Sequence, residues 1–315
     1  MMNLRFFQEL AGKKTVLLAG AGGGFDIFTG LPLYFALRSA GKTVHLANLS
    51  FSTIYASTGK RIGEALVEVC ADTFSRERYF PELYLAQWFA KRGEDIPIYC
   101  FDRVGVRPIT AGYRELAERL AIDAVILMDG GTDSLMRGDE TGLGTPEEDI
   151  ASIAAVEALP VAMKILACLG FGIDTFHGVC HAQFLEAVAD IMRSGGFLGS
   201  WSVAQEMPEA KLYREAADFV HAKMPYNASI VNTSILSAID GRFGNYQSAP
   251  RTRGSELFIN PLMSLYWTFE LAAVAKRNLY INRVRETETY GELSLTIQSF
   301  RDELPMQKPW QPLPM

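Results

Sequence analysis

Short apolar runs alternate with longer amphipathic stretches along the first half of the chain. The apolar runs are rich in β-branched and aliphatic residues, which predicts strands at residues 15–20, 43–49, 96–101, 124–129 and 164–171. The intervals carry apolar residues at helical spacing, which predicts helices at 31–40, 61–70, 82–91, 113–120 and 146–159. Alternation of this kind is typical of a parallel sheet that is covered by helices on both faces.

The alternation continues with a predicted helix at 181–193, a strand at 197–203, a helix at 209–221 and a strand at 229–233. Residues 261–275 are interpreted as a buried helix whose Tyr266, Trp267 and Phe269 pack in the core. The sequence therefore predicts an α/β fold: a doubly wound, mostly parallel, Rossmann-like sheet with helices on both faces and a helical C-terminal extension. Residues 1–304 are predicted to form one domain, and residues 305–315 a surface tail.

Composition narrows the class of protein. Of the 315 residues 49% are hydrophobic, the net charge is −6 and the pI is near 5.4. The Lys and Arg residues are dispersed, so we expect neither nucleic acid nor a membrane surface as a partner. The N-terminus lacks the apolar core of a signal peptide, and the four cysteines form no C-x-x-C pair. A cytoplasmic protein is expected.

Three loops are expected to form a binding site together. In a doubly wound sheet, ligands bind beyond the carboxyl ends of the strands where the strand order reverses, commonly between the first and fourth strands. The loops after the first, fourth and fifth predicted strands span residues 20–30, 129–140 and 170–181, and all three are rich in glycine and polar residues. We therefore expect these loops to meet.

The first loop contains Gly20, Gly22, Gly23 and Gly24, which are predicted to bind a phosphate group. Residues without Cβ atoms let backbone N–H groups approach an anion. Gly20 and Gly22 match the dinucleotide pattern G-x-G-x-x-G, but Phe25 replaces its third glycine and no acid ends the second strand. No Walker lysine is present, which excludes a P-loop. The structural alternative is a tight turn without a ligand.

Asp26 follows these glycines, where a carboxylate would repel a bound phosphate. It is therefore predicted to act as a catalytic base, or to hold a metal or a sugar hydroxyl. The alternative is an N-cap of the following helix.

The second loop places Asp129, Asp133, Asp139 and Glu140 within 12 residues. These carboxylates repel each other unless Arg137 or a divalent cation neutralises them. Magnesium is the natural candidate, with Asp129 and Asp133 as its ligands. Alternatively, these acids have no functional role.

The pattern of residues 145–149, which follow this loop, predicts the beginning of a helix. Thr145 is the expected N-cap and Pro146 the first helical residue. The acids Glu147, Glu148 and Asp149 are interpreted as a structural first turn.

The third loop supplies Asp174, His177 and His181. Asp174 and His177 are catalytic candidates, because a carboxylate or a neutral imidazole can accept a proton. If this segment is helical, His177 and His181 share one face, and His181 could ligate a metal. A pair of hydrogen-bonded histidines at the edge of the core is the alternative.

Two later residues could close the pocket. Asn232 is expected to end a strand, and Arg253 lies in an aperiodic stretch, where an arginine can bind phosphate. Both are predicted to contact the cofactor or substrate, although a solvated surface loop is the alternative for Arg253.

The segments GAGGGFDIFTGLPL, DGGTDSLMRGDE, DTFHGVCHAQFLE and GSELFINPLM resemble the domain-of-unknown-function 1152 family. This resemblance implies no activity. The first loop is also similar to sirtuin-type NAD-binding loops, with Gly30, Leu31 and Pro32 following the GAG motif. That similarity implies NAD as a cofactor, although the spacing differs and the sirtuin zinc cysteines have no counterpart.

Together these features predict an enzyme, a hydrolase or transferase, that acts on a nucleotide or phosphorylated small molecule with the help of a metal ion. An NAD-binding enzyme of the sirtuin type and a nucleotide sensor without turnover are the alternatives. The sequence leaves open whether the chain forms a homo-oligomer.

Overall fold

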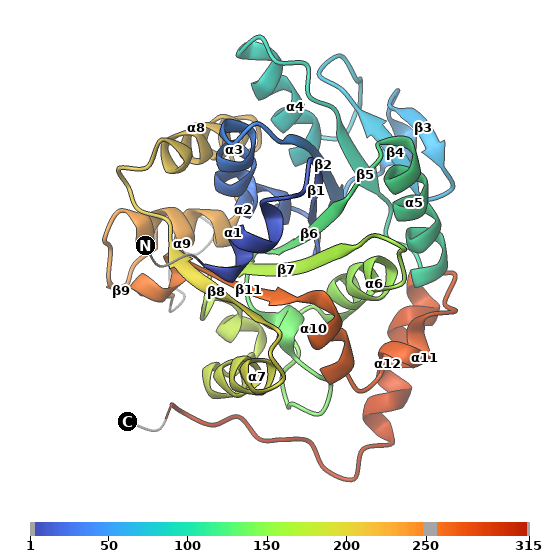
Figure 1. Cartoon of the computed structure of the whole chain (residues 1–315), viewed down its shortest axis with the longest axis vertical. Coiled ribbons are helices and arrows are strands. Elements are labelled where there is room, and N and C mark those ends of the chain that lie inside the picture. The colour runs from blue at the N-terminus through green and yellow to red at the C-terminus, as the bar shows by residue number, and fades with distance from the viewer. Residues whose placement is uncertain (1–3, 248–256, 314–315) are drawn as a thin grey trace.

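A nine-stranded sheet forms the centre of the computed structural model, which describes residues 4–247 and 257–313 (Figure 1). The strands lie in the order β3-β4-β5-β2-β1-β6-β7-β11-β8. Their bounds are β1 (Thr15–Gly20), β2 (Thr43–Leu49), β3 (Lys60–Gly63), β4 (Leu66–Val69), β5 (Ile98–Phe101), β6 (Ala124–Asp129), β7 (Met163–Leu169), β8 (Phe197–Ser202) and β11 (Leu265–Glu270). A separate two-stranded sheet pairs β9 (Gly244–Asn245) with β10 (Phe258–Ile259).

The five central strands, β5, β2, β1, β6 and β7, are parallel. From β1 the chain continues to its neighbour β2, forms the hairpin β3–β4 at the edge of the sheet and returns to β5 beside β2. It then crosses back to place β6 on the other side of β1. Strand order therefore reverses between β1 and β6. The α/β fold with a doubly wound, mostly parallel sheet is confirmed, and its switch point lies where the sequence predicted it.

Helices cover both faces of the sheet (Figure 1). One face carries α1 (Arg5–Leu10), α2 (Asp26–Thr29), α3 (Leu31–Ser39), α4 (Pro81–Lys91), α8 (Pro208–Lys223) and α9 (Ile230–Ile239). The other carries α5 (Val106–Arg119), α6 (Pro146–Glu157), α7 (His181–Arg193), α10 (Leu271–Arg277), α11 (Ile281–Val284) and α12 (Tyr290–Asp302).

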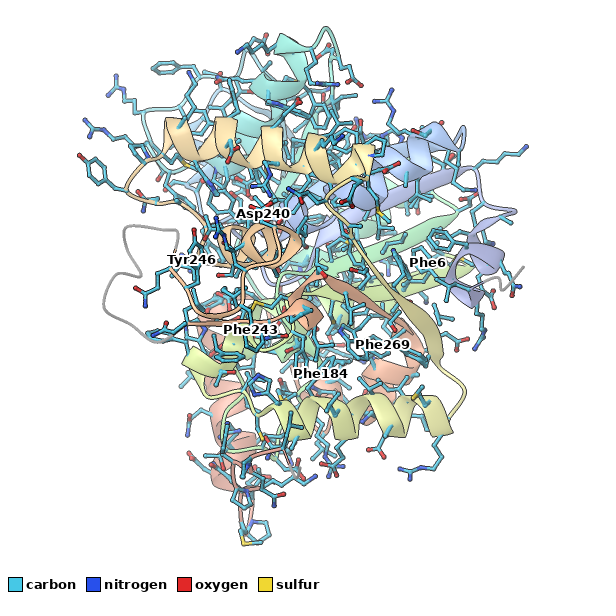
Figure 2. The ribbon with its side chains drawn as sticks, turned by 90° about the vertical axis from the view of Figure 1, so that its left-hand side faces the viewer. Phe6, Phe184, Asp240, Phe243, Tyr246 and Phe269 are labelled. Atoms are coloured by element: carbon cyan, nitrogen blue, oxygen red, sulfur yellow. The ribbon has the colours of Figure 1, made fainter. Side chains whose placement is uncertain are left out.

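Two hydrophobic cores result, because successive side chains of a strand point to opposite faces. Leu17 and Leu18 of β1, for example, are both fully buried but belong to different cores. Phe6 marks one core, and Phe184 and Phe269 mark the other (Figure 2).

The helix predicted at residues 61–70 is wrong, since this segment forms the antiparallel hairpin β3–β4 at one edge of the sheet. Its glutamate and alanine favour a helix, but Val67 and Val69 are buried while Glu68 between them is partly exposed. This period of two fits a strand, and pairing with β5 stabilises it.

The single helix predicted at 261–275 is also wrong. This segment contains the 3₁₀ turn η5 (Pro261–Ser264), strand β11 and helix α10. Strand β11 runs antiparallel between β7 and β8, so Tyr266, Trp267 and Phe269 lie on a strand rather than a helix. Tyr266 and Phe269 are buried, as expected of core residues.

The strand predicted at 229–233 is the first turn of α9. Ile230, Val231 and Thr233 are β-branched and favour a strand. Ser229 instead caps a helix, because its hydroxyl accepts the N–H of Asn232 at 3.1 Å.

The C-terminal region is helical through α12, and the following chain runs along α7. Lys308 anchors it there by a main-chain bridge to Glu140 and an ion pair with Glu186. The division into residues 1–304 and 305–315 stays a prediction. None of the described helices is both long and apolar enough to cross a lipid bilayer.

Candidate functional site

The three predicted loops line a pocket of about 270 Å³ at the carboxyl ends of β1 and β6. The first loop contributes residues 22–26, the second contributes Asp129, Gly130 and Asp133, and the third contributes Asp174 and His177. Phe51, Tyr79, Thr145, Asp149, Ser229, Ile230 and Val231 complete the lining. The expectation that the loops meet at the switch point is confirmed.

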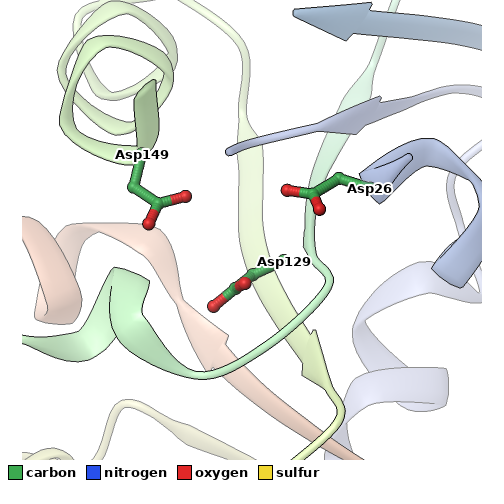
Figure 3. Close-up of side chains that lie close together, drawn as sticks. All are labelled: Asp26, Asp129 and Asp149. Atoms are coloured by element: carbon green, nitrogen blue, oxygen red, sulfur yellow. The ribbon is translucent and has the colours of Figure 1, made fainter. Parts of the chain in front are cut away.

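Three aspartates from different elements converge in this pocket. Asp26 begins α2, Asp129 ends β6, and Asp149 lies in the first turn of α6. One carboxylate oxygen of each lies within 4.8 Å of those of the other two. In Figure 3 the carboxylates of Asp26 and Asp149 face each other, with that of Asp129 beside them. We call these three residues the aspartate triad.

Two further aspartates, Asp133 and Asp174, line the same pocket and are held by neighbouring loops. The Oδ2 atom of Asp133 accepts the N–H of Thr145 at 2.8 Å, and that of Asp174 accepts the N–H of Thr132 at 2.6 Å. Five carboxyl groups therefore share one small space. No Lys or Arg lines the pocket within the part of the chain that the structure describes.

Asp149 differs from the other four in its hydrogen bonding. Its side chain is buried, with 3% exposed, and neither carboxylate oxygen has a partner among the described residues. Its neighbours Glu147 and Glu148 accept hydrogen bonds from Ser294 and Tyr290. The structural interpretation of the first turn therefore fits both glutamates, whereas Asp149 lies in the pocket.

Burial and mutual repulsion raise the pKa values of these acids. Burial, followed by the charge of Asp133, raises the pKa of Asp129 to about 7. Burial is also the main cause that raises the pKa of Asp26, Asp149 and Asp174, and neighbouring aspartates add to it. The negative charge is thus costly in this pocket unless a cation accompanies it.

The glycines of the loops make room for these carboxylates. A Cβ atom on Gly22 would lie 2.7 Å from Oδ1 of Asp149 and 2.8 Å from Oδ2 of Asp26. A Cβ on Gly130 would lie 2.7 Å from Oδ1 of Asp26. Gly131 and Gly144 pack in the same way against Asp174 and Asp133. Side chains at these positions would displace the aspartates.

The first loop offers fewer free amides than the phosphate prediction requires. The N–H of Gly22 donates to Oδ2 of Asp26 at 2.7 Å, and the N–H of Gly24 donates to the carbonyl of Leu49 at 3.0 Å. Gly23 and Gly24 have φ values of +90° and +61°, so they allow the sharp turn. Gly20 packs against Asn48 behind the pocket and is not among its lining residues.

The N-cap alternative for Asp26 does not hold. The N-cap of α2 is Phe25, and the Asp26 carboxylate bonds back to Gly22 instead of to an amide of the helix. One oxygen of the Asp26 carboxylate also lies within 4.8 Å of those of the other two members of the triad.

The two histidines of the third loop do not share a helix face. His177 ends the 3₁₀ turn η3 (Ile173–His177), Gly178 follows with a φ of +86°, and α7 begins only at His181. His177 is exposed and lines the pocket. His181 is not among the lining residues and packs on the ring of Phe171, with centroids 5.0 Å apart. The two histidines are therefore not placed to share a metal.

Asp139 and Glu140 of the second loop lie outside the lining. Arg137 forms a two-pronged ion pair with Asp139, at 2.9 and 2.7 Å. Glu140 accepts the backbone N–H groups of Arg137 and Gly138. Both acids thus stabilise the loop itself.

Asn232 lies wholly buried in α9, and its side chain is used within the protein. Its amide donates to the carbonyl of Phe25 at 3.3 Å and to Ser229, and its oxygen accepts from Tyr213. Asn232 is not among the lining residues, but it ties α9 to the first loop. Arg253 lies outside the described residues.

Sequence reasoning missed Asp149 and the first turn of α9. A spacing argument could have found Asp149, because it follows the acidic second loop at the start of the next helix. The sequence could not assign the residues at the start of α9 to the pocket, since their β-branched pattern indicated a strand.

Comparison with known proteins supplies a family but no activity. A family described as "Protein of unknown function (DUF1152)" matches residues 58–300, more than half of the chain. This range includes the second and third loops and follows the first. No curated protein and no solved structure matches, so the sirtuin similarity stays an expectation. The chain therefore belongs to the DUF1152 family.

Proposed function

We propose that the aspartate triad binds a divalent cation, with magnesium as the first candidate. The observation that carries this proposal is Asp149, a buried carboxylate whose two oxygens have no partner among the described residues. A buried carboxylate without a hydrogen bond or counter-charge costs several kcal/mol. A cation bound between Asp149, Asp26 and Asp129 would remove that cost.

The donor set supports an oxygen-preferring cation. The triad offers carboxylate oxygens only, which suit Mg²⁺, Mn²⁺ or Ca²⁺ better than zinc or copper. The Cys168 thiol lies near Ser134, which donates to Asp129, but burial raises the pKa of that thiol well above its usual range. A neutral thiol is a poor metal ligand.

The cation would in turn carry a phosphorylated small molecule for hydrolysis or group transfer. A metal ion polarises a phosphoryl group and positions its ester bond. In hydrolysis, the attacking water bonds to phosphorus and gives up a proton to a base, while the bond to the leaving oxygen breaks and that oxygen takes up a proton. With Asp26 holding the cation, Asp174 and His177 are groups at the pocket that could accept the proton from water.

Binding of Mn²⁺ to metal-stripped protein, followed by electron paramagnetic resonance, tests the cation site. We expect one saturable site in the wild type and a loss of affinity of at least tenfold in Asp149→Asn. Without metal, Asp149→Asn should be more stable than the wild type, because the amide removes a buried charge. At about 100 times Kd, the cation should raise the wild-type melting temperature by about 2 °C or more.

Asp72→Asn is the matched control, since Asp72 is exposed and is not among the lining residues of the pocket. It should bind Mn²⁺ as the wild type does. Equal Mn²⁺ affinity in the wild type and Asp149→Asn would overturn the cation site. The reaction is then tested by phosphate release from mononucleotides and sugar phosphates with magnesium.

The two alternatives predict other outcomes. NAD binding that a chelator leaves unchanged would favour the sirtuin-type enzyme. Nucleotide binding that changes the oligomeric state without product would favour a sensor.

A further inference from the structure

The amino end of helix α9 lines the pocket together with the carboxylate-rich loops. Ser229, Ile230 and Val231 line the pocket, and they are the N-cap and the first two residues of this ten-residue helix. The N–H groups of Ile230 and Val231 have no acceptor among the described residues. The first amides of a helix lack partners within it and, together with the helix dipole, attract anions.

Helix α9 is fixed beside the triad. Gly130 separates them, since a Cβ there would lie 2.7 Å from Oδ1 of Asp26 and 3.2 Å from Cγ1 of Val231. The Asn232 amide also binds the carbonyl of Phe25, the residue before Asp26. A ligand in the pocket can therefore contact the carboxylates and the end of α9 at once.

His221 holds the N-cap in place. Its Nε2 atom accepts the N–H of Ser229 at 3.2 Å. Burial lowers the pKa of His221 to about 4, so the ring is neutral near pH 7 and can accept this bond. The Ser229 hydroxyl accepts from Asn232, and the N–H groups of Ile230 and Val231 remain available to a ligand.

Charge balance determines what this composite site can hold. A free anion would be repelled by five carboxyl groups, and the pocket has no Lys or Arg among its described lining residues. A cation alone would leave the end of α9 unused. A ligand that joins a cation to an oxyanion can place the cation against the carboxylates and the oxyanion against the end of α9. The Asp149 oxygens, which have no partner among the described residues, indicate where the cation binds.

We infer that α9 provides the anion subsite, and that the ligand is a small phosphomonoester bound as its divalent-metal complex. The inference rests on the proposed function, because the triad must hold the cation. The phosphate would then bind the N–H groups of Ile230 and Val231 instead of those of the first loop. Two N–H groups of the first loop already donate hydrogen bonds within the protein.

The pocket volume favours a small ligand. About 270 Å³ lies just below the range of about 300–1,000 Å³ that is typical for drug-sized ligands. A sugar phosphate fits this volume better than a dinucleotide does. The exposed ring of Phe51 and that of Tyr79 line the pocket and could contact the non-phosphate part of the ligand.

Ile230→Pro tests the subsite, because proline removes one N–H and is tolerated at the first position of a helix. The preceding Ser229 already has a ψ of 122°, which a following proline requires. Ile230→Ala is the control that keeps the N–H. The probes are Mn²⁺, inorganic phosphate, ribose 5-phosphate and NAD, each titrated by calorimetry.

In the wild type and Ile230→Ala, phosphate and ribose 5-phosphate should bind only when Mn²⁺ is present. Ile230→Pro should bind Mn²⁺ alone as the wild type does but bind ribose 5-phosphate at least tenfold more weakly. If Ile230→Pro does not fold, Ile230→Asp replaces it, since an acid stabilises this helix position but repels phosphate.

The outcomes separate the two proposals. Absence of Mn²⁺ binding in the wild type would overturn the cation site. Normal Mn²⁺ binding with unchanged ribose 5-phosphate affinity in Ile230→Pro, or in Ile230→Asp where it replaces the proline variant, would overturn the α9 subsite alone. A wild type that binds Mn²⁺ but no phosphate would do the same. NAD binding tighter than ribose 5-phosphate would overturn the small-ligand assignment.

Discussion

The two halves of the second loop carry the same residue types and use them differently. Asp129 and Asp133 lie in the pocket, while Asp139 and Glu140 lie a few residues further along and outside it. Asp139 is neutralised by Arg137, and Glu140 accepts hydrogen bonds from two backbone N–H groups. The pocket acids have no basic partner within the described lining residues and crowd against other acids.

This difference shows how a structural acid can be told from a candidate functional one. The structural carboxylates have a counter-charge, as Asp139 does, or two backbone N–H donors, as Glu140 does, so they are stable without a ligand. The triad instead places like charges within 4.8 Å of one another and raises their pKa values by burial. Such an arrangement costs stability, and we expect a ligand to recover it.

The largest effect is expected when a glycine of the pocket gains a side chain. Gly22→Ala would place a Cβ against Asp26 and Asp149, so we expect a loss of about 1–3 kcal/mol of stability and at least tenfold weaker Mn²⁺ binding. Gly12→Ala is the matched control, because nothing lies within 4 Å of its Cβ position. Urea unfolding and Mn²⁺ titration measure both effects. Unchanged Mn²⁺ binding in Gly22→Ala would contradict the pocket geometry.

A smaller effect is expected from pH. The pKa of Asp129 is raised to about 7 in the folded protein, so the fold binds this proton more tightly than the unfolded chain does. The free energy of unfolding of the metal-free protein should therefore fall as pH rises from about 4 to about 7. Asp129→Asn lacks this contribution. The difference in free energy of unfolding between the wild type and Asp129→Asn should therefore change by about 1 kcal/mol or more between pH 4 and pH 7.

Magnesium at saturation should remove this pH dependence, because the cation favours the charged carboxylates.

The comparison with Asp129→Asn is needed because His221, whose pKa is lowered, changes the free energy of unfolding in the opposite direction over an overlapping pH range. If the difference in free energy of unfolding between the wild type and Asp129→Asn did not vary between pH 4 and pH 7, the pKa of Asp129 would not be raised in the folded protein.

The smallest effect is expected for the paired acids. Asp139→Asn weakens a partly exposed ion pair with Arg137, so the loss should be about 0.2–1 kcal/mol. Mn²⁺ affinity should equal that of the wild type. If Asp139→Asn weakened Mn²⁺ binding as much as Asp149→Asn, the distinction between the two halves of the loop would fail.

Much of the fold could be predicted because the central strands are apolar and short, and strong helical patterns separate them. The predicted bounds of β1, β2 and β6 match those observed. The failures occur at 61–70, 229–233 and 261–275, where local propensity and tertiary environment disagree. Segment 265–270 forms a strand because it pairs with both β7 and β8.

The candidate site was predicted in part. The loops, Asp26, Asp129, Asp133, Asp174, His177 and the glycines at 22–24 all line the pocket. His181 and Asn232 do not, since the first lies beyond the Gly178 turn and the second is used inside α9. Their side-chain directions depend on where the turns fall, which composition and spacing do not specify.

The sequence by itself determined the α/β class, because strand and helix periodicity are local properties. The switch point and the loops that meet there followed from the usual strand order of a doubly wound sheet. Only the tertiary structure decided which acids share the pocket and which are paired. Packing brings Asp149 to within 4.8 Å of Asp26, a residue more than 100 positions earlier. It also makes the glycines neighbours of carboxylates and directs the start of α9 into the pocket. Distances between residues remote in sequence depend on how the helices pack against the sheet.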